Sequence, residues 1–334
     1  MQKFFPEFED RFKALLESAK GRKIAVAGHM RPDGDCVSSQ FALAHMLREA
    51  GAEQVVCVNQ NALPHTYANF AGSEKLLDAS EFCDDQFEIV TVDCADYSRA
   101  GENLTGRFPN PLACIDHHVT NKTYARINIL DSGAAATAEI IAGLALDAFG
   151  KVSKEDADRL YMGIAMDTRQ FTTSSTRTRT FEISAKLAEN GADTAWVAVQ
   201  LYQRESFAKM KLLAAYLKTL TMHIGGRVCM GTLPTGIYEL TGAQKADSDG
   251  LVDYARSIDG VEVGILLEQM PHGVKGSLRG KTPEYRVDEV AAMFGGGGHL
   301  AAAGFTAEGE KLETFAPKLI EIFERRLSGG RPKH

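Results

Sequence analysis

The sequence has little of what marks a membrane protein, a secreted protein or a protein that coats nucleic acid. No run approaches the roughly 20 consecutive apolar residues that a membrane span needs. The first 23 residues alternate acids and bases around apolar positions, so they lack the apolar core of a signal peptide. The net charge of −7 argues against broad attraction to long nucleic acid, which normally relies on a basic face. We therefore expect a cytoplasmic protein that binds neither a membrane nor long nucleic acid.

Cysteine is scarce and scattered. The 334 residues include six cysteines, none of them in a CxxC pair, so we expect neither a disulfide framework nor a structural zinc site. Most lie in or beside apolar, strand-like segments, which predicts buried and reduced thiols. With 44% hydrophobic and 24% charged residues, the composition is typical of a soluble globular protein, and the length allows two domains.

Short apolar runs alternate with helical patterns along the first half of the chain. Near-continuous apolar strands separated by helices predict an α/β fold, with a mostly parallel sheet covered by helices on both faces. The predicted strands are 23–29, 54–59, 87–93 and 112–118, and the predicted helices are 37–50, 137–150 and 154–166.

The pattern changes near residue 225, where strands joined by short helices predict a second, smaller α/β domain. Residues 195–222 predict one long amphipathic helix between the two domains. We place the first domain at 1–185, a helical linker at 186–224 and the second domain at 225–330.

Acids and histidines follow the ends of three predicted strands and of the helix at 154–166. Ligands gather at the carboxyl ends of strands in parallel sheets, and carboxylates brought together there repel one another unless a cation lies among them. A pair of divalent metal ions satisfies this requirement, and mixed imidazole and carboxylate donors suit Mn²⁺, Zn²⁺ or Fe²⁺ better than Ca²⁺. The residues are His29, Asp33, Asp35, Asp93, Asp116, His117, His118 and Asp167.

Each of these signals has an ordinary structural alternative when it is taken alone. A single histidine is more often a hydrogen-bonded core residue than a ligand, and a single aspartate at a strand end is often a helix cap. The glycine run at 295–298 follows a helical stretch, and no Lys-Ser/Thr pair follows it, so it is neither a dinucleotide fingerprint nor a phosphate-binding P-loop. Two readings stay open for it: an anion-binding nest, or a tight turn that packs two small-residue segments.

Five motifs, in this order, resemble those of the DHH phosphoesterase superfamily with its DHH-associated domain. The resemblance extends from about residue 20 to 327 and is strongest to the stand-alone nanoRNase and pAp-phosphatase branch. The motifs are GHMRPDGDCVSS (28–39), VDCADYSRAG (92–101), IDHHVTN (115–121), GIAMDTRQF (163–171), and SLRG (277–280) with GGGGHLAAAG (295–304).

The resemblance implies a site with two metal ions, usually manganese, and assigns a role to each candidate. His29 and Asp33 would hold one ion, Asp35, His117 and Asp167 the other, and Asp93 would bridge the two. Asp116 would orient a histidine, and His118 would face the scissile phosphate. The phosphate ligands implied are Arg99, Arg279 and His299, with Gly296, Gly297 and Gly298 approaching the substrate.

The sequence departs from the family pattern after the last predicted metal ligand. Relatives commonly have Asp-Thr-Gly, whereas Asp167 and Thr168 are followed here by Arg169 and Gln170. Arg169 is then either an additional phosphate ligand or a surface charge.

The function implied is hydrolysis of short oligonucleotides to mononucleotides by a metal-activated hydroxide, with 3′-phosphoadenosine 5′-phosphate (pAp) as a second substrate. Three alternatives remain: a manganese pyrophosphatase, a phosphodiesterase for cyclic or linear dinucleotides, and a nucleotide-binding regulator without activity. The sequence leaves the oligomeric state open, with a homodimer as one candidate.

Overall fold

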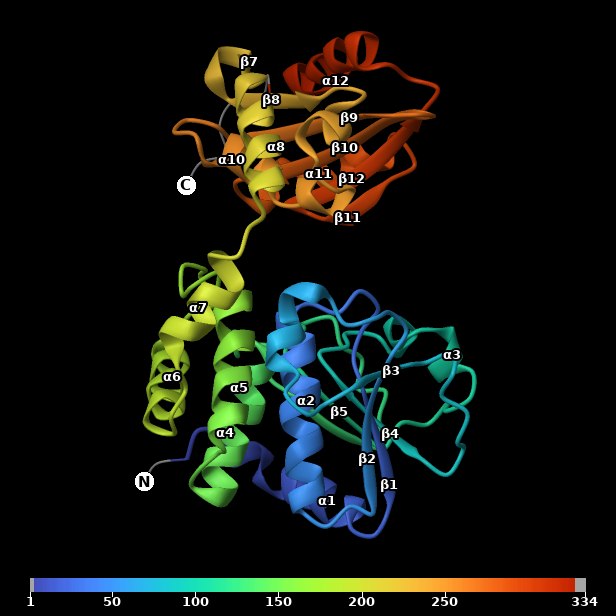
Figure 1. The fold of residues 1–334 in the computed structure, drawn as a ribbon, viewed down its shortest axis with the longest axis vertical. Coiled ribbons are helices and arrows are strands. Elements are labelled where there is room, and N and C mark those ends of the chain that lie inside the picture. Colours follow the sequence, from blue (N-terminus) through green and yellow to red (C-terminus); the bar gives the residue numbers. More distant parts are fainter. Residues whose placement is uncertain (1–2, 328–334) are drawn as a thin grey trace. The chain divides into compact units, whose positions relative to one another are not determined.

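The computed structural model describes residues 3–327 and divides the chain into two units, one ending at Arg204 and the other beginning at Glu205 (Figure 1). Each unit is built around its own six-stranded sheet. This confirms the predicted α/β class with a second α/β domain. No helix in the described part of the chain is long and apolar enough to cross a bilayer.

The sheet of the N-terminal unit is parallel throughout, in the order β3-β2-β1-β4-β5-β6. Its central strands are apolar along their length because both of their faces are buried. The strands are β1 (Lys23–Ala27), β2 (Gln54–Asn59), β3 (Leu76–Asp78), β4 (Glu88–Val92), β5 (Ala113–Asp116) and β6 (Ile127–Leu130).

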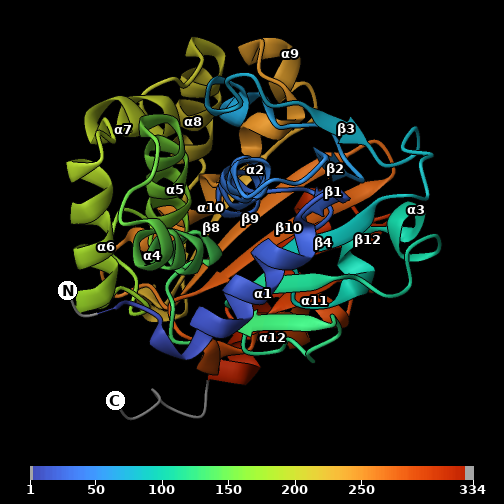
Figure 2. The same cartoon turned by 90° about the horizontal axis from the view of Figure 1, so that it is seen from below.

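The longer helices of this unit lie on one face of the sheet, and a short helix with several loops covers the other (Figures 1 and 2). Helix α2 is buried on nearly all sides because the sheet, α4 and α5 surround it. The helices are α1 (Glu9–Ala19), α2 (Gly34–Glu49), α3 (Glu102–Thr105), α4 (Thr137–Phe149), α5 (Lys154–Asp167), α6 (Thr178–Glu189) and α7 (Thr194–Tyr202).

The strand order reverses direction between β1 and β4. From this pair the chain proceeds outward to β2 and β3 on one side and to β5 and β6 on the other. Loops that leave the carboxyl ends of such neighbouring strands diverge, which is where parallel sheets bind ligands. The loops that follow β1 and β4 carry His29 and Asp93.

The single helix predicted over 195–222 is wrong, because the chain forms two helices there. Helix α7 ends at Tyr202, and α8 (Phe207–Lys218) begins after Ser206, whose hydroxyl accepts a hydrogen bond from the Lys209 amide at 3.0 Å. A serine in this position caps a new helix, so the polar segment between them is a boundary. The division between the two units falls within this segment.

The sheet of the C-terminal unit is mixed, in the order β11-β12-β10-β9-β8-β7, with only β8 and β9 parallel. Helices α11 and α12 pack on one face, and α8, α9 and α10 pack on the other. The strands are β7 (Thr221–His223), β8 (Val228–Leu233), β9 (Val263–Met270), β10 (Gly273–Gly280), β11 (Gly297–His299) and β12 (Ala302–Glu308), and the remaining helices are α9 (Ile237–Thr241), α10 (Leu251–Ser257), α11 (Val287–Ala292) and α12 (Leu312–Leu327).

Candidate metal centre

The N-terminal unit brings the predicted metal ligands together at the carboxyl edge of its sheet. Four structural positions deliver them: the loop after β1 with the first turn of α2, the residue after β4, the end of β5, and the last residue of α5. The side chains that converge are those of His29, Asp33, Asp35, Asp93, His117, His118 and Asp167.

Asp93 lies at the centre of the cluster. One of its carboxylate oxygens, Oδ2, is 3.4 Å from His29 Nε2, and the other, Oδ1, is 3.6 Å from His117 Nε2. The Thr137 hydroxyl also donates to Oδ1 at 3.1 Å. The two oxygens therefore face two different histidines, which is the arrangement that a bridging carboxylate requires.

His29 and Asp33 form the first group around Asp93. The ring atom His29 Nδ1 lies 2.8 Å from the carbonyl oxygen of Met30, which can only accept, so Nδ1 carries the proton. This leaves Nε2 facing the carboxylates, at 3.7 Å from Asp33 Oδ2. The backbone carbonyl thus fixes the ring in the orientation that a metal-binding histidine needs.

Asp35, His117 and Asp167 form the second group, with ligand atoms within 4.8 Å of one another. His117 Nε2 lies 3.2 Å from Asp167 Oδ2. The fully buried Asp35 carboxylate accepts backbone N–H groups from Thr137 at 2.7 Å and Ala138 at 2.8 Å, at the start of α4. Helix amino termini stabilise negative charge, so α4 holds Asp35 in place.

The pKa values of these groups record an excess of negative charge. Burial raises the pKa of Asp35 well above its usual range, and the nearby charges of Asp93 and Asp167 raise it further. Burial lowers the pKa of His117, but its hydrogen bond to Asp167 and the surrounding carboxylates outweigh this effect and raise the pKa to about 10. Burial opposes protonation of His29 in the same way, and Asp33 and Asp93 raise its pKa to about 10.

Within the described residues of the N-terminal unit, 3–204, no lysine or arginine forms an ion pair with any of these carboxylates. The four carboxylates outnumber the two histidines that pair with them, and imidazole with carboxylate is a donor set that divalent transition metals accept. The side chains therefore fit a divalent metal centre. Cys36 also lies beside His29 and Asp93, and burial raises the pKa of its thiol well above the usual range, which disfavours the thiolate.

His118 differs from His117 in what holds it. Its Nδ1 lies 2.7 Å from Asp116 Oδ1, while Asp116 Oδ2 accepts from the Asn121 amide at 2.7 Å. Burial raises the pKa of Asp116, but these hydrogen bonds outweigh it and lower the pKa below its usual value. An ionised Asp116 therefore fixes the His118 ring and leaves Nε2 free of any hydrogen bond to the described residues.

Left-handed backbone conformations are concentrated in the loops of this site. Eight residues other than glycine have positive φ within residues 3–327, and five of them are a predicted metal ligand or lie within four residues of one. Each such conformation costs roughly 1–2 kcal/mol for a residue with a Cβ. The five are Arg31, Asp93, Arg169, Gln170 and Phe171.

The predicted phosphate ligands fall into both units. Arg99 lies next to the metal centre, because its carbonyl oxygen accepts from the Met30 amide at 2.6 Å. In the C-terminal unit, Arg279 on β10 and His299 on β11 both pair with Ala302 on β12. Directly paired residues of neighbouring strands share a face, so Arg279 and His299 flank the small Ala302 in one row across that sheet.

Packing explains two of the glycines in the run at 295–298. A Cβ at Gly296 would lie 2.2 Å from the Gly304 carbonyl oxygen, and one at Gly298 would lie 2.4 Å from the Ala302 carbonyl oxygen, so these two glycines allow β11 to pair with β12. A Cβ at Gly297 would meet nothing within 4 Å. Packing therefore accounts for Gly296 and Gly298.

Two residues of the site were not identified from the sequence. Thr137 supplies both a hydroxyl to Asp93 and an amide to Asp35, and Asn121 holds Asp116. Asn121 lies within the quoted motif IDHHVTN, so its position was a usable signal. For Thr137 the sequence offered only a weak signal, namely a threonine at the start of an apolar helical run.

Comparison with known proteins agrees with this arrangement. Residues 23–164 match the DHH family, N-terminal domain, and residues 234–325 match the DHHA1 domain. The bifunctional oligoribonuclease and PAP phosphatase NrnA of Thermus thermophilus is 29% identical over 328 residues, which cover 97% of this chain and 96% of that protein.

Two further relatives extend the comparison. A Streptococcus mutans protein named probable bifunctional oligoribonuclease and PAP phosphatase NrnA is 30% identical over 304 residues, covering 88% of this chain and 92% of that protein. The crystal structure of an exopolyphosphatase-related protein from Bacteroides fragilis superposes with a TM-score of 0.84 at 25% identity, covering 97% of both chains.

Proposed function

From the premise that the chain belongs to the DHH family, we propose that it is a metal-dependent phosphoesterase that hydrolyses short oligonucleotides to mononucleotides. We propose pAp, converted to AMP, as a second substrate. The names of the relatives from T. thermophilus and S. mutans support both activities.

One observation carries the proposal: four carboxylates and two histidines converge, and none of the described lysines or arginines of the N-terminal unit pairs with them. His29 and Asp33 would hold one divalent ion, Asp35, His117 and Asp167 a second, and Asp93 both. Mn²⁺ is the ion we propose, because it accepts mixed nitrogen and oxygen donors. Two such ions would supply an activated hydroxide at neutral pH and neutralise charge that develops on the phosphate.

The chain's own residues would then orient the substrate and stabilise its transition state. Asp116 holds His118 by Nδ1, so the imidazolium form of the ring would donate a hydrogen bond from Nε2 to a phosphate oxygen. Negative charge grows on those oxygens as the bond to the leaving group breaks, so a fixed donor stabilises the transition state more than the bound substrate. Arg99, beside the same loop, is proposed as a further phosphate ligand.

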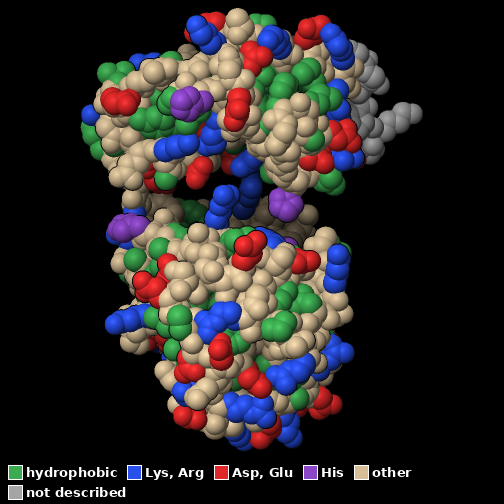
Figure 3. Space-filling model, turned by 90° about the vertical axis from the view of Figure 1, so that its right-hand side faces the viewer, with side chains coloured by type: hydrophobic (Ala, Val, Ile, Leu, Met, Phe, Trp, Pro, Cys, Tyr) green, Lys and Arg blue, Asp and Glu red, His purple; other side chains and the backbone are tan. Residues whose placement is uncertain are grey.

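The surface charge is consistent with short substrates. On the face that Figure 3 shows, acidic and basic side chains are interspersed over each unit, without an extended field of one sign. A long strand normally requires a continuous basic path along its backbone. A dinucleotide or trinucleotide needs only a few local contacts.

The direct test is hydrolysis of labelled oligoribonucleotides of graded length in the presence of Mn²⁺. We expect dimers and trimers to be degraded faster than long strands, and chelation of the metal to stop the reaction. A preference for long strands would contradict the substrate assignment. Pyrophosphate, a cyclic dinucleotide and its linear product belong in the same panel, since faster turnover of any of them would identify one of the alternative activities.

Nucleotide binding without hydrolysis would indicate the remaining alternative, a regulator. The cytoplasmic location and the homodimer stay predictions from the sequence.

A further inference from the structure

The turn that follows α5 is a Schellman motif with an arginine in the position that usually holds glycine. Two backbone hydrogen bonds define it: Gln170 N–H to the Ala165 carbonyl at 2.8 Å, and Arg169 N–H to the Met166 carbonyl at 3.0 Å. Arg169 is the residue in the left-handed conformation, with φ of 46°. Glycine at this position would adopt the conformation without a steric penalty.

The strain does not end with Arg169. Gln170 and Phe171 continue in the left-handed region at φ of 60° and 63°. The turn is held from both sides, because the Phe171 amide donates to the Thr168 hydroxyl at 3.0 Å and the Phe171 ring stacks on Phe181 at a centroid distance of 5.2 Å. The surrounding structure thus imposes the conformation on Arg169.

The Arg169 side chain forms no hydrogen bond or ion pair with the described residues that would offset this strain, and it is exposed. It does not reach even Asp167, two residues before it. Strained residues that persist without an internal role are concentrated at ligand-binding sites.

The turn adjoins the rest of the metal centre. A Cβ at Gly34, in the first turn of α2, would lie 2.6 Å from Met166 Cγ, so the end of α5 packs directly against the loop that carries His29 and Asp33. An unpaired cation at this point lies at the rim of the carboxylate cluster. The chemical group that an exposed guanidinium binds best there is a phosphate.

We propose that Arg169 binds a phosphate of the substrate other than the one that is hydrolysed. This inference rests on the proposed function and adds a specificity to it. The hydrolysed phosphate would be held by the metal ligands and His118, whereas Arg169 lies outside ion-pair distance of that cluster. A 5′-phosphorylated dinucleotide and pAp both carry a second phosphate, and an unphosphorylated dinucleotide does not.

The test compares pApA with ApA, which share the same scissile bond, in the wild type and in Arg169→Gln, with Mn²⁺ present. We expect Arg169→Gln to lower kcat/KM for pApA by roughly tenfold or more, mainly through KM, because a charge-assisted hydrogen bond is lost. We expect a change below about twofold for ApA, whose only phosphate is the hydrolysed one. Arg169→Lys should recover part of the preference for pApA.

Arg169→Gly and Gln170→Gly distinguish the effect of losing the arginine charge from the effect of relieving the backbone strain. Both remove a Cβ from a left-handed position, so both should raise the midpoint of urea unfolding. Only Arg169→Gly should lose the preference for pApA. Equal slowing of pApA and ApA in Arg169→Gln, or loss of the preference in Gln170→Gly, would overturn the inference while leaving the proposed function intact. A wild type that hydrolyses neither dinucleotide would overturn the proposed function, and this inference with it.

Discussion

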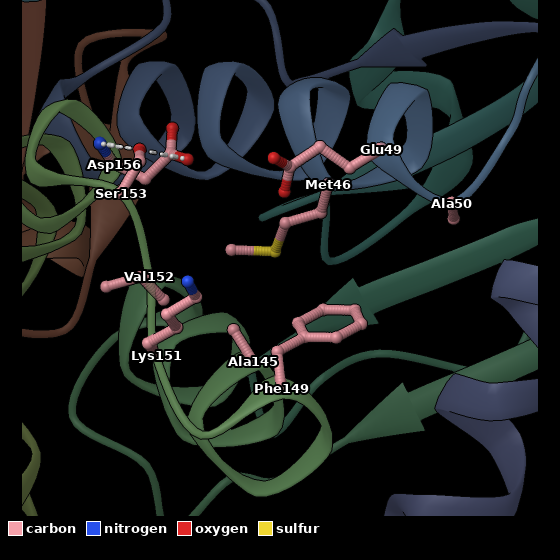
Figure 4. Close-up of a pocket in the computed structure, with 9 residues that line it drawn as sticks. All are labelled: Met46, Glu49, Ala50, Ala145, Phe149, Lys151, Val152, Ser153 and Asp156. Atoms are coloured by element: carbon pink, nitrogen blue, oxygen red, sulfur yellow. Dashed lines mark hydrogen bonds between the residues drawn. The ribbon is translucent and has the colours of Figure 1, made fainter.

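At one end of the α2–α5 helix pair, the carboxylates of Asp35 and Asp167 face one another and His117, and no arginine or lysine within residues 3–204 pairs with them. At the other end, Asp156 accepts hydrogen bonds from Ser153 at 2.7 Å and Arg159 at 3.1 Å and also pairs with His45. Figure 4 shows Ser153 and Asp156 at this far end, beside a cavity of about 430 Å³. Both ends bury aspartate and use histidine, and they differ in charge balance.

At the far end, called the balanced end below, the carboxylates have an arginine partner, and Arg159 uses every nitrogen of its guanidinium. Besides Asp156 and Glu155, it donates to the carbonyl oxygens of Phe70 at 2.9 Å and Ala71 at 2.7 Å. A buried charge with such partners is a structural element, whereas a cluster with surplus carboxylates requires a ligand from outside the chain. Both ends use aspartate and histidine, and what separates them is whether an arginine pairs with the carboxylates.

Asp93→Ala should produce the largest change. Metal-assisted charge stabilisation is worth several kcal/mol, which corresponds to a loss of about 10³-fold or more in activity. Because the substitution removes one charge from a surplus, the free energy of unfolding of the metal-free protein should not fall. Hydrolysis of a dinucleotide, calorimetric Mn²⁺ titration and urea unfolding measure the three quantities. Retained activity would contradict the bridging role.

Arg159→Met, at the balanced end, should lower the stability and leave the activity nearly unchanged, the opposite of Asp93→Ala. Removing one partner from a buried ion pair typically costs about 3–5 kcal/mol of stability, because the remaining charge stays buried. Activity per folded molecule should stay within about twofold of the wild type. Urea unfolding and the kcat of the folded fraction test this, and Asp156→Asn, which keeps the side chain's shape, serves if Arg159→Met does not fold. A loss of Mn²⁺ affinity in either variant would show that the two ends are coupled.

His118→Asn tests a residue of the unbalanced end that is not assigned to the metal. Loss of a positioned donor lowers kcat by roughly 10²-fold, at the lower end of the range for general acid or base groups. Mn²⁺ affinity should change only a few-fold, since His29, His117 and the carboxylates remain. Asn121→Ala, which removes one hydrogen bond to Asp116, should give a smaller loss of kcat. A large loss of Mn²⁺ affinity in His118→Asn would place His118 among the ligands.

The sequence predicted the site better than it predicted its surroundings. His29, Asp93 and His117 are chemically conspicuous, and they end or follow apolar runs that predict buried strands, so their convergence was expected and the structure brings them together. The short strands β3 and β6 were not predicted, because three or four residues at the edge of a sheet leave little periodicity.

Properties that depend on strand register or backbone conformation could not be predicted from the sequence. The placement of Arg279 and His299 on either side of Ala302 requires the pairing of three strands, which no local pattern encodes. The left-handed φ of Arg169 results from packing around Phe171 and contradicts the local preference of arginine. The break before Ser206 was missed although its capping residue was visible.

Gly163→Ala should give the smallest effect and tests how closely the two helices must approach at the unbalanced end. A Cβ there would lie 2.2 Å from Ser38 Oγ and 2.9 Å from Asp35 Oδ1, so the overpacked helices must separate, at a cost of about 1–3 kcal/mol. The gain in helix propensity over glycine offsets up to about 1 kcal/mol of this. Because the strain falls on Asp35, the affinity for Mn²⁺ should fall. The stabilisation by added Mn²⁺ should then decrease as well, since it depends on the ratio of metal concentration to Kd. Urea unfolding with and without Mn²⁺ measures the loss of stability and the stabilisation by the metal. If the stabilisation by Mn²⁺ is unchanged, Asp35 tolerates displacement. The surplus of carboxylates then binds the metal without a fixed geometry.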